Sequence, residues 1–173
     1  MRIKNILLST FFVLIISLPT LAQRGVPTFG QYSARVEKLP NIQVDLKSSK
    51  YARNYRTNLR NAAKQGVNFA GHFVVANWGC GTNCSETAII DGRTGKVFFP
   101  EILQGATFGF CEIGDSIDEP IQYKKNSRVF ILNGFKSGDL DKKDSKCGIY
   151  YFEWTGTALR QVKLVEKKRM EMP

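Results

Sequence analysis

The chain has 173 residues, of which 43% are hydrophobic, and a formal net charge of +10 at pH 7. These values are those of a small globular protein, and the length fits one domain. The sequence contains no internal repeat and no low-complexity segment, which argues against repeat and low-complexity architectures. A basic protein can meet anionic partners, although the same charge also keeps a small domain soluble.

The first 22 residues have the pattern of a secretory signal peptide. A short basic head with Arg2 and Lys4 precedes an apolar run over 6–18, and Pro19 ends that run. Small residues then indicate a cleavage site after Ala22. The apolar run is shorter than the ~20 residues that span a bilayer. We therefore expect a protein exported to the periplasm or the extracellular space, with no transmembrane segment after cleavage.

Residues 23–47 are predicted to form an extended lead-in, because prolines, glycines and scattered apolar residues punctuate them. A helix is predicted over 48–65, with a serine cap at its start and Gly66 at its end. Its apolar face contains Tyr51, Tyr55, Leu59 and Ala62. The opposite face carries Arg53, Arg56, Arg60 and Lys64. This basic stripe is either a solvated face or an anion-binding surface.

From residue 69 onward the pattern changes to short strands separated by turns. The predicted strands are 71–77, 86–91, 96–99, 107–113, 128–133, 148–154 and 158–165. Their close spacing without intervening helices favours antiparallel meanders. Charged stretches over 115–126 and 134–146 are predicted to be exposed loops.

The predicted fold class is α+β, with one amphipathic N-terminal helix packed on an antiparallel meander sheet and stabilised by disulfides. A single domain is expected over 48–165, followed by a charged tail over 166–173. All four cysteines follow the predicted cleavage site, and an even number in an exported chain implies disulfides. Three pairings are possible, of which we predict Cys80–Cys84 and Cys111–Cys147.

The stretch 68–99 contains N-F-A-G-H-F, then W-G-C-G-x-x-C, then I-I-D-x-x-T-G-K-V. In these motifs it resembles a family of small exported bacterial proteins that has no assigned activity. The resemblance implies a grouping and a related fold, and it implies no mechanism.

His72 is the chain's single histidine, and it has a structural and a catalytic interpretation. The structural one is a half-buried side chain bonded to backbone or to a carboxylate. The catalytic one is a general acid or base. Glu86, across adjacent strands, could act with it in a ribonuclease-like hydrolase. Alternatively, Cys80 could be a thiolate nucleophile activated by His72 in a cysteine hydrolase, which requires a free thiol.

Metal and redox interpretations of the central stretch are weaker. A zinc site with Cys80, Cys84 and His72 lacks a clear fourth ligand, and oxidation competes with thiolate ligation outside the cytosol. The C-x-x-x-C spacing differs from the redox C-x-x-C motif. The acids of 139–144 do not match a calcium loop. We therefore predict no metal and no cofactor.

Trp78, beside the glycine-cysteine turn, could anchor a protein or glycan partner. The sequence thus favours a soluble or envelope-associated binding domain whose disulfide-pinned Trp-Gly-Cys-Gly turn is a rigid recognition surface. The expected partner is a protein, a glycan or an anionic envelope component, and nucleic acid is a weaker alternative. The predicted binding residues are Trp78, Arg53, Arg56, Arg60 and Lys64. The alternatives are the small hydrolase and a purely structural envelope protein.

Overall fold

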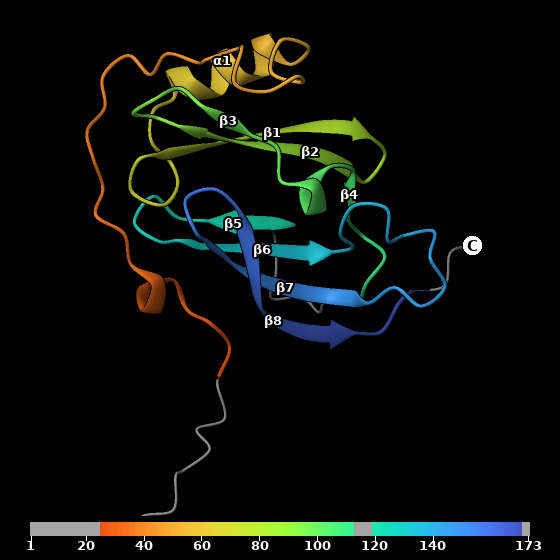
Figure 1. Cartoon of the computed structure of the whole chain (residues 1–173). Coiled ribbons are helices and arrows are strands. Elements are labelled where there is room, and N and C mark those ends of the chain that lie inside the picture. Colours follow the sequence, from red (N-terminus) through yellow and green to blue (C-terminus); the bar gives the residue numbers. More distant parts are fainter. Residues whose placement is uncertain (1–24, 113–118, 171–173) are drawn as a thin grey trace, which may run out of the picture.

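The computed structural model describes residues 25–112 and 119–170, so the predicted signal peptide over 1–22 lies outside the described residues. The described part contains one α-helix and two four-stranded antiparallel sheets (Figure 1). Within it, no helix has the length and apolar character needed to cross a membrane. The predicted α+β class and antiparallel pairing are confirmed. The prediction of one meander sheet is wrong, because the strands divide between two sheets.

The first sheet is built around a central β2. Its strands are β1 (Phe73–Gly81), β2 (Cys84–Asp91), β3 (Val97–Phe98) and β4 (Ala106–Thr107). β1 pairs along one edge of β2, and β3 and β4 share the other edge, so β1 is an edge strand. Val74 and Ala76 of β1 face one apolar cluster, and Phe73 and Val75 face another. This sheet is therefore covered on both faces.

The second sheet is a meander in the order β5-β6-β7-β8. Its strands are β5 (Ile121–Tyr123), β6 (Val129–Gly134), β7 (Cys147–Trp154) and β8 (Leu159–Lys167). β5 lies within the stretch predicted as an exposed loop. β8 continues past residue 165, and Arg169 then forms a bridge with Cys111, so the start of the predicted tail is held in the fold.

The helix, the first sheet and the second sheet follow one another from top to bottom (Figure 1). The helix α1 (Arg56–Lys64) packs on the outer face of the first sheet, whose inner face meets the second sheet. The 3-10 helix η1 (Phe29–Tyr32) packs on the outer face of the second sheet, and η2 (Glu101–Leu103) follows β3. Trp154 and Phe130 are fully buried between the sheets.

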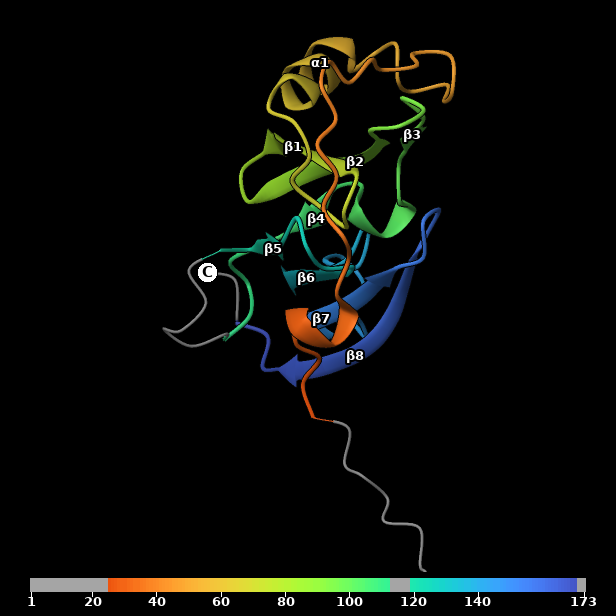
Figure 2. The ribbon, with the colours of Figure 1, turned by 90° about the vertical axis from the view of Figure 1, so that its left-hand side faces the viewer.

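Residues 33–45 cross both sheets on one side of the molecule (Figure 2), and we call this segment the strap. Backbone hydrogen bonds fix it to the sheet ends. The amide of Glu37 donates to the Gly71 carbonyl at 2.8 Å, and the amide of Asp45 donates to the Gly95 carbonyl at 2.9 Å. The predicted lead-in is thus a structural element that ties the layers together.

The helix begins at Arg56 and not at residue 48. Of the two serines expected to cap it, Ser48 bonds to other groups and Ser49 accepts only from the Tyr51 amide at 3.3 Å. The hydroxyl of Ser48 donates to the Asp45 carbonyl and accepts a hydrogen bond from the Val97 amide at 2.9 Å. Residues 50–55 therefore form turns. In consequence Ala52 is buried, whereas Tyr51, predicted on the apolar face, is 45% exposed.

Both predicted disulfides are present. Cys80 and Cys84 close the tip of the β1–β2 hairpin, with Cα atoms 5.2 Å apart. Cys111 and Cys147 join the segment after β4 to the start of β7, with Cα atoms 5.7 Å apart. No cysteine of the chain is free.

Candidate functional site

Four cations project from α1 and the turn before it: Arg53, Arg56, Arg60 and Lys64. We call this group the basic flank. All four residues are exposed, and the spacing of three and four residues aligns them along the helix. None of them forms an ion pair with a carboxylate in the described part of the chain. The group therefore presents uncompensated positive charge to solvent.

The start of α1 lies beside β1 and near the segment after β3. The Tyr55 ring there lies 4.8 Å from that of Trp78 in β1 and 6.0 Å from that of Phe99, which follows β3. Arg60 lies roughly 140° around the helix from Tyr55, on the exposed part of α1. Figure 2 shows α1 above β1 and the segment before it above β3.

Trp78 packs under the start of α1 and does not stand free at the turn. Its ring centroid lies 4.8 Å from that of Tyr55, and the residue is half-buried. The hairpin tip beyond it, residues 79–83, is exposed. Gly81 and Asn83 have φ values of 144° and 55°, which the tight turn requires. Trp78 thus fixes the exposed hairpin against the helix.

His72 lies in a hollow at the other end of β1, which Arg35 and Lys38 also line. Its side chain is 18% exposed. The Nδ1 atom lies 3.9 Å from Glu37 Oε1, and the Nε2 atom lies 3.7 Å from Asp91 Oδ1. Arg93 donates to both carboxylate oxygens of Glu37. The imidazole therefore sits between a carboxylate of the strap and one of the β2–β3 hairpin.

The pKa of His72 lies below its ordinary value. Burial is the largest cause, and the positive charge of Arg93 acts in the same direction, while Asp91 and Glu37 oppose it. The two carboxylates lie beyond hydrogen-bonding distance, so their attraction does not outweigh the loss of hydration. The side chain is accordingly neutral at pH 7.

The structure does not bring His72 together with Glu86 or Cys80. Glu86 pairs with Trp78, roughly 20 Å along the strand from His72 at ~3.3 Å per residue. Burial raises the pKa of Glu86, and a hydrogen bond from the Gly105 backbone lowers it in part. Cys80 is bonded to Cys84 and supplies no thiolate.

The groups that do surround His72 are poorly placed for phosphoryl transfer. An acid and a base must act on opposite sides of the phosphorus, and 3.9 Å between His72 and Glu37 leaves no space for it. Both ring nitrogens already face carboxylates. The geometry favours the structural interpretation, in which His72 packs between the strap and the β2–β3 hairpin. The sequence pattern missed Glu37 and Arg93, because neither lies near His72 along the chain.

Replacing His72 by glutamine should make stability less sensitive to acid. The folded protein holds the His72 pKa below its ordinary value of ~6.5, so the unfolded chain takes up the proton first as pH falls. The wild type should therefore lose more stability than His72→Gln between pH 7.5 and 5. Denaturant unfolding at several pH values measures the difference. Parallel pH profiles would contradict this expectation.

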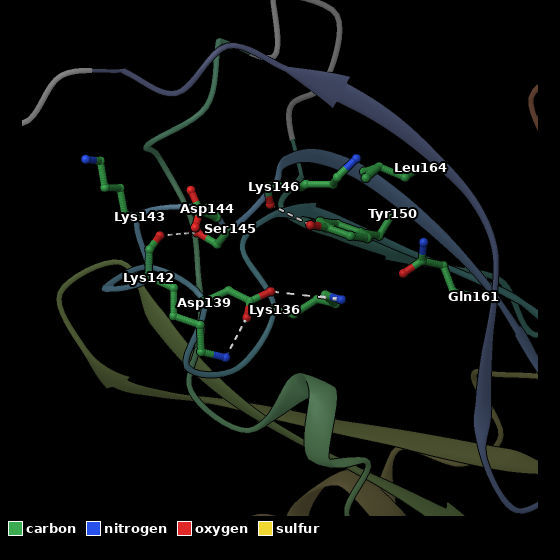
Figure 3. A pocket seen from close by; sticks show the side chains of 10 residues that line it. All are labelled: Lys136, Asp139, Lys142, Lys143, Asp144, Ser145, Lys146, Tyr150, Gln161 and Leu164. Carbon is green, nitrogen blue, oxygen red and sulfur yellow. Dashed lines mark hydrogen bonds and ion pairs between the residues drawn. The ribbon is translucent and has the colours of Figure 1, made fainter.

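A second hollow is lined with lysines from the loop between β6 and β7 (Figure 3). Asp139 turns into it, with carboxylate oxygens 3.1 Å from Lys142 Nζ and 3.9 Å from Lys136 Nζ. Lys146 Nζ lies 2.9 Å from Glu166. These ion pairs compensate most of the positive charge of the lysines that line the hollow. In the part that the structure describes, no three His, Cys, Asp or Glu side chains gather as a metal site would require.

The structure places Trp78 beside Tyr55 at the start of α1, as a support and not a free anchor. The basic flank and the exposed hairpin tip meet where Tyr55 contacts Trp78. Comparison of the chain with protein-family models, with curated proteins and with solved structures found no match.

Proposed function

We propose that this chain is an exported domain that binds an anionic partner through the basic flank. The observation that carries the proposal is the lack of carboxylate partners for the flank within the described residues. Three other arginines differ in this respect, since Arg93, Arg128 and Arg160 pair with Glu37 or Glu153. Exposed cations without an internal partner keep their field available to an incoming anion.

The basic flank stands on a rigid support, which favours binding. Leu59 and Ala63 anchor α1 on the first sheet. The hairpin beside it is closed by the Cys80–Cys84 disulfide. Cations held on a fixed scaffold lose less conformational freedom on binding than cations on a mobile loop. Export is supported by the signal-peptide pattern and by the pairing of all four cysteines.

Reversing two charges of the flank, in Arg56→Glu/Arg60→Glu, should weaken binding to inorganic polyphosphate about tenfold or more. It should also reduce the dependence of the affinity on salt, because fewer counterions are released. Fluorescence anisotropy with labelled polyphosphate at several salt concentrations measures both quantities. Both residues are exposed, so the fold should tolerate the change.

The matched control is Lys125→Glu/Lys143→Glu, which makes the same change in net charge. Both lysines are exposed and lie in loops next to the second sheet. This variant should bind within about twofold of the wild type if the flank is the site. Equal losses in the two variants would mean that net charge alone drives binding, and the proposal would fail.

A further inference from the structure

The hollow beside His72 has the size of a small-molecule site, and we call it the strap hollow. Its lining consists of part of the strap and three residues outside it: 34–39, Ala70, His72 and Arg93. Its volume is about 770 Å³, which lies in the range of ligand pockets. The lining contains three cations, Arg35, Lys38 and Arg93, and one anion, Glu37. The hollow therefore has a positive lining.

Glu37 fixes the orientation of Arg93. The Nε and Nη2 atoms of Arg93 donate to the two oxygens of the Glu37 carboxylate. A guanidinium group has five N–H donors in a planar fork, so this pair occupies one edge of the fork. The Nη1 atom has no partner within 25–112 and 119–170, and the Arg93 side chain is 54% exposed. Arg93 is thus held on one side, while the edge formed by Nη1 and Nη2 is free.

Arg35 and Lys38 add two cations from a segment whose backbone is fixed. The amides of Ala34 and Glu37 each donate to a carbonyl outside the strap at 2.8 Å. These two bonds enclose Arg35 and directly precede Lys38. Both cations are exposed, and neither forms an ion pair with a carboxylate in the described part of the chain. Their charges are therefore available to a molecule in the hollow.

We propose that the strap hollow binds a small, doubly charged oxyanion, such as a phosphate monoester or a dicarboxylate. The free edge of Arg93 donates to two oxygens of one anionic group, because the guanidinium fork matches the oxygens of a carboxylate or a phosphate. Arg35 and Lys38 supply further positive charge. This site is separate from the basic flank, so the inference goes beyond the proposed function.

The second carboxylate near His72 does not take part in the hollow. Asp91 is absent from the lining. Its oxygens accept hydrogen bonds from the Arg93 amide at 2.9 Å and from the Thr94 hydroxyl at 2.8 Å. These donors hold the Asp91 carboxylate in the β2–β3 hairpin. Glu37 is then the one carboxylate that an anion in the hollow meets, and its charge is offset by Arg93.

His72 reports on the hollow, because it is the chain's single histidine and its ring is part of the lining. In tag-free protein the Hε1 proton of the ring gives one NMR signal from this site. Inorganic phosphate and succinate, titrated separately at pH 7.5 and constant ionic strength, should move this signal to saturation with a Kd of about 1 mM. Saturation by only one of them assigns the anion class. No saturation by either would overturn the inference.

Arg93→Lys keeps the positive charge and removes the fork. It should weaken binding of the saturating anion about fivefold, because a lysine donates as a point charge and not through two parallel bonds. The same titration measures this loss. If Arg93→Lys binds the anion like the wild type, recognition by the free edge is excluded.

Arg35→Gln removes one of the unpaired charges and should also weaken binding about fivefold. The matched control is Arg56→Gln, which removes an exposed arginine of the basic flank that likewise has no ion pair in the described residues. This control should bind the anion within about twofold of the wild type. Equal losses in Arg35→Gln and Arg56→Gln would mean that net charge alone attracts the anion, and the inference would fail.

The two proposed anion sites fail separately. Arg56→Glu/Arg60→Glu should lose polyphosphate and still show the saturating response of His72 to the small anion. If this variant loses both responses, the strap hollow is not a separate site. If polyphosphate binds through the flank while neither small anion moves the His72 signal to saturation, the flank stands and the strap hollow falls.

Discussion

Replacing Cys111 and Cys147 together by alanine should lower the free energy of unfolding by about 4 kcal/mol. The disulfide joins residues 36 positions apart, so it removes much of the freedom of the unfolded chain. Both cysteines are buried beside Phe135, and their loss also removes packing between the segment after β4 and the start of β7. Equilibrium unfolding in urea under oxidising conditions measures the change. For a domain of ordinary stability this is a large fraction of the total.

The matched control is the pair Cys80→Ala/Cys84→Ala, whose loop spans only 4 positions. The same chain-entropy relation gives about 2 kcal/mol for the shorter loop. Cys80 is exposed, so little packing is lost with it. A larger loss from the hairpin disulfide than from Cys111–Cys147 would show that loop length does not set the order of the two effects.

Local patterns predicted much of this fold correctly. The hairpin turn at Asp91 has the expected form, since its carboxylate accepts from the Arg93 amide at 2.9 Å and the Thr94 hydroxyl at 2.8 Å. The pairing of the strands was harder to predict, because it depends on contacts between residues that are distant in sequence. β5 has only three residues, too few to show an alternating pattern, and is specified by its pairing with β6. The helix starts later than predicted, and the amide of Val97, far along the chain, donates a hydrogen bond to the hydroxyl of Ser48.

The residues of the motif around His72 have structural roles that the sequence motif alone does not reveal. Asn68 covers the edge of β1, and Phe69 is fully buried in the core. Gly71 has a φ of 88°, and a side-chain carbon there would overlap the Arg35 carbonyl oxygen of the strap. His72 then lies between Glu37 and Asp91. The roles of Gly71 and His72 depend on where the strap lies, and residue types in a linear motif do not report that position.

The place of β1 within its sheet was also beyond sequence reasoning. Alternation predicts which side chains share a face of a strand, but it does not say which strand ends a sheet. That β1 is an edge strand follows from β3 and β4 sharing the other side of β2. The basic stripe, in contrast, was predicted from helical spacing. Its four residues are exposed as expected, and the contact of Tyr55 with Trp78, which places the start of α1 beside β1, is what the structure adds.

Replacing Gly95 by alanine should destabilise the fold by roughly 4 kcal/mol, through the strap. Gly95 has a φ of 77°, which alone costs an alanine about 1 kcal/mol. In addition, the new carbon would overlap the Gln43 carbonyl oxygen and lie 2.9 Å from the Asp45 nitrogen. The strap must then move away, and the hydrogen bond from Asp45 to the Gly95 carbonyl is lost. Urea unfolding measures the loss, and amide exchange at Asp45 locates it.

Gly66→Ala separates the overlap from the backbone effect. Gly66 ends α1 with a φ of 82°, close to that of Gly95, but a side-chain carbon there meets no atom within 4 Å. This variant should lose about 1 kcal/mol, and its Asp45 amide should exchange as slowly as in the wild type. If Gly66→Ala and Gly95→Ala are equally destabilised, contact with the strap contributes nothing at Gly95. A difference of roughly 3 kcal/mol would instead show that the strap is a packed part of the fold, held closely enough to position Glu37 beside His72.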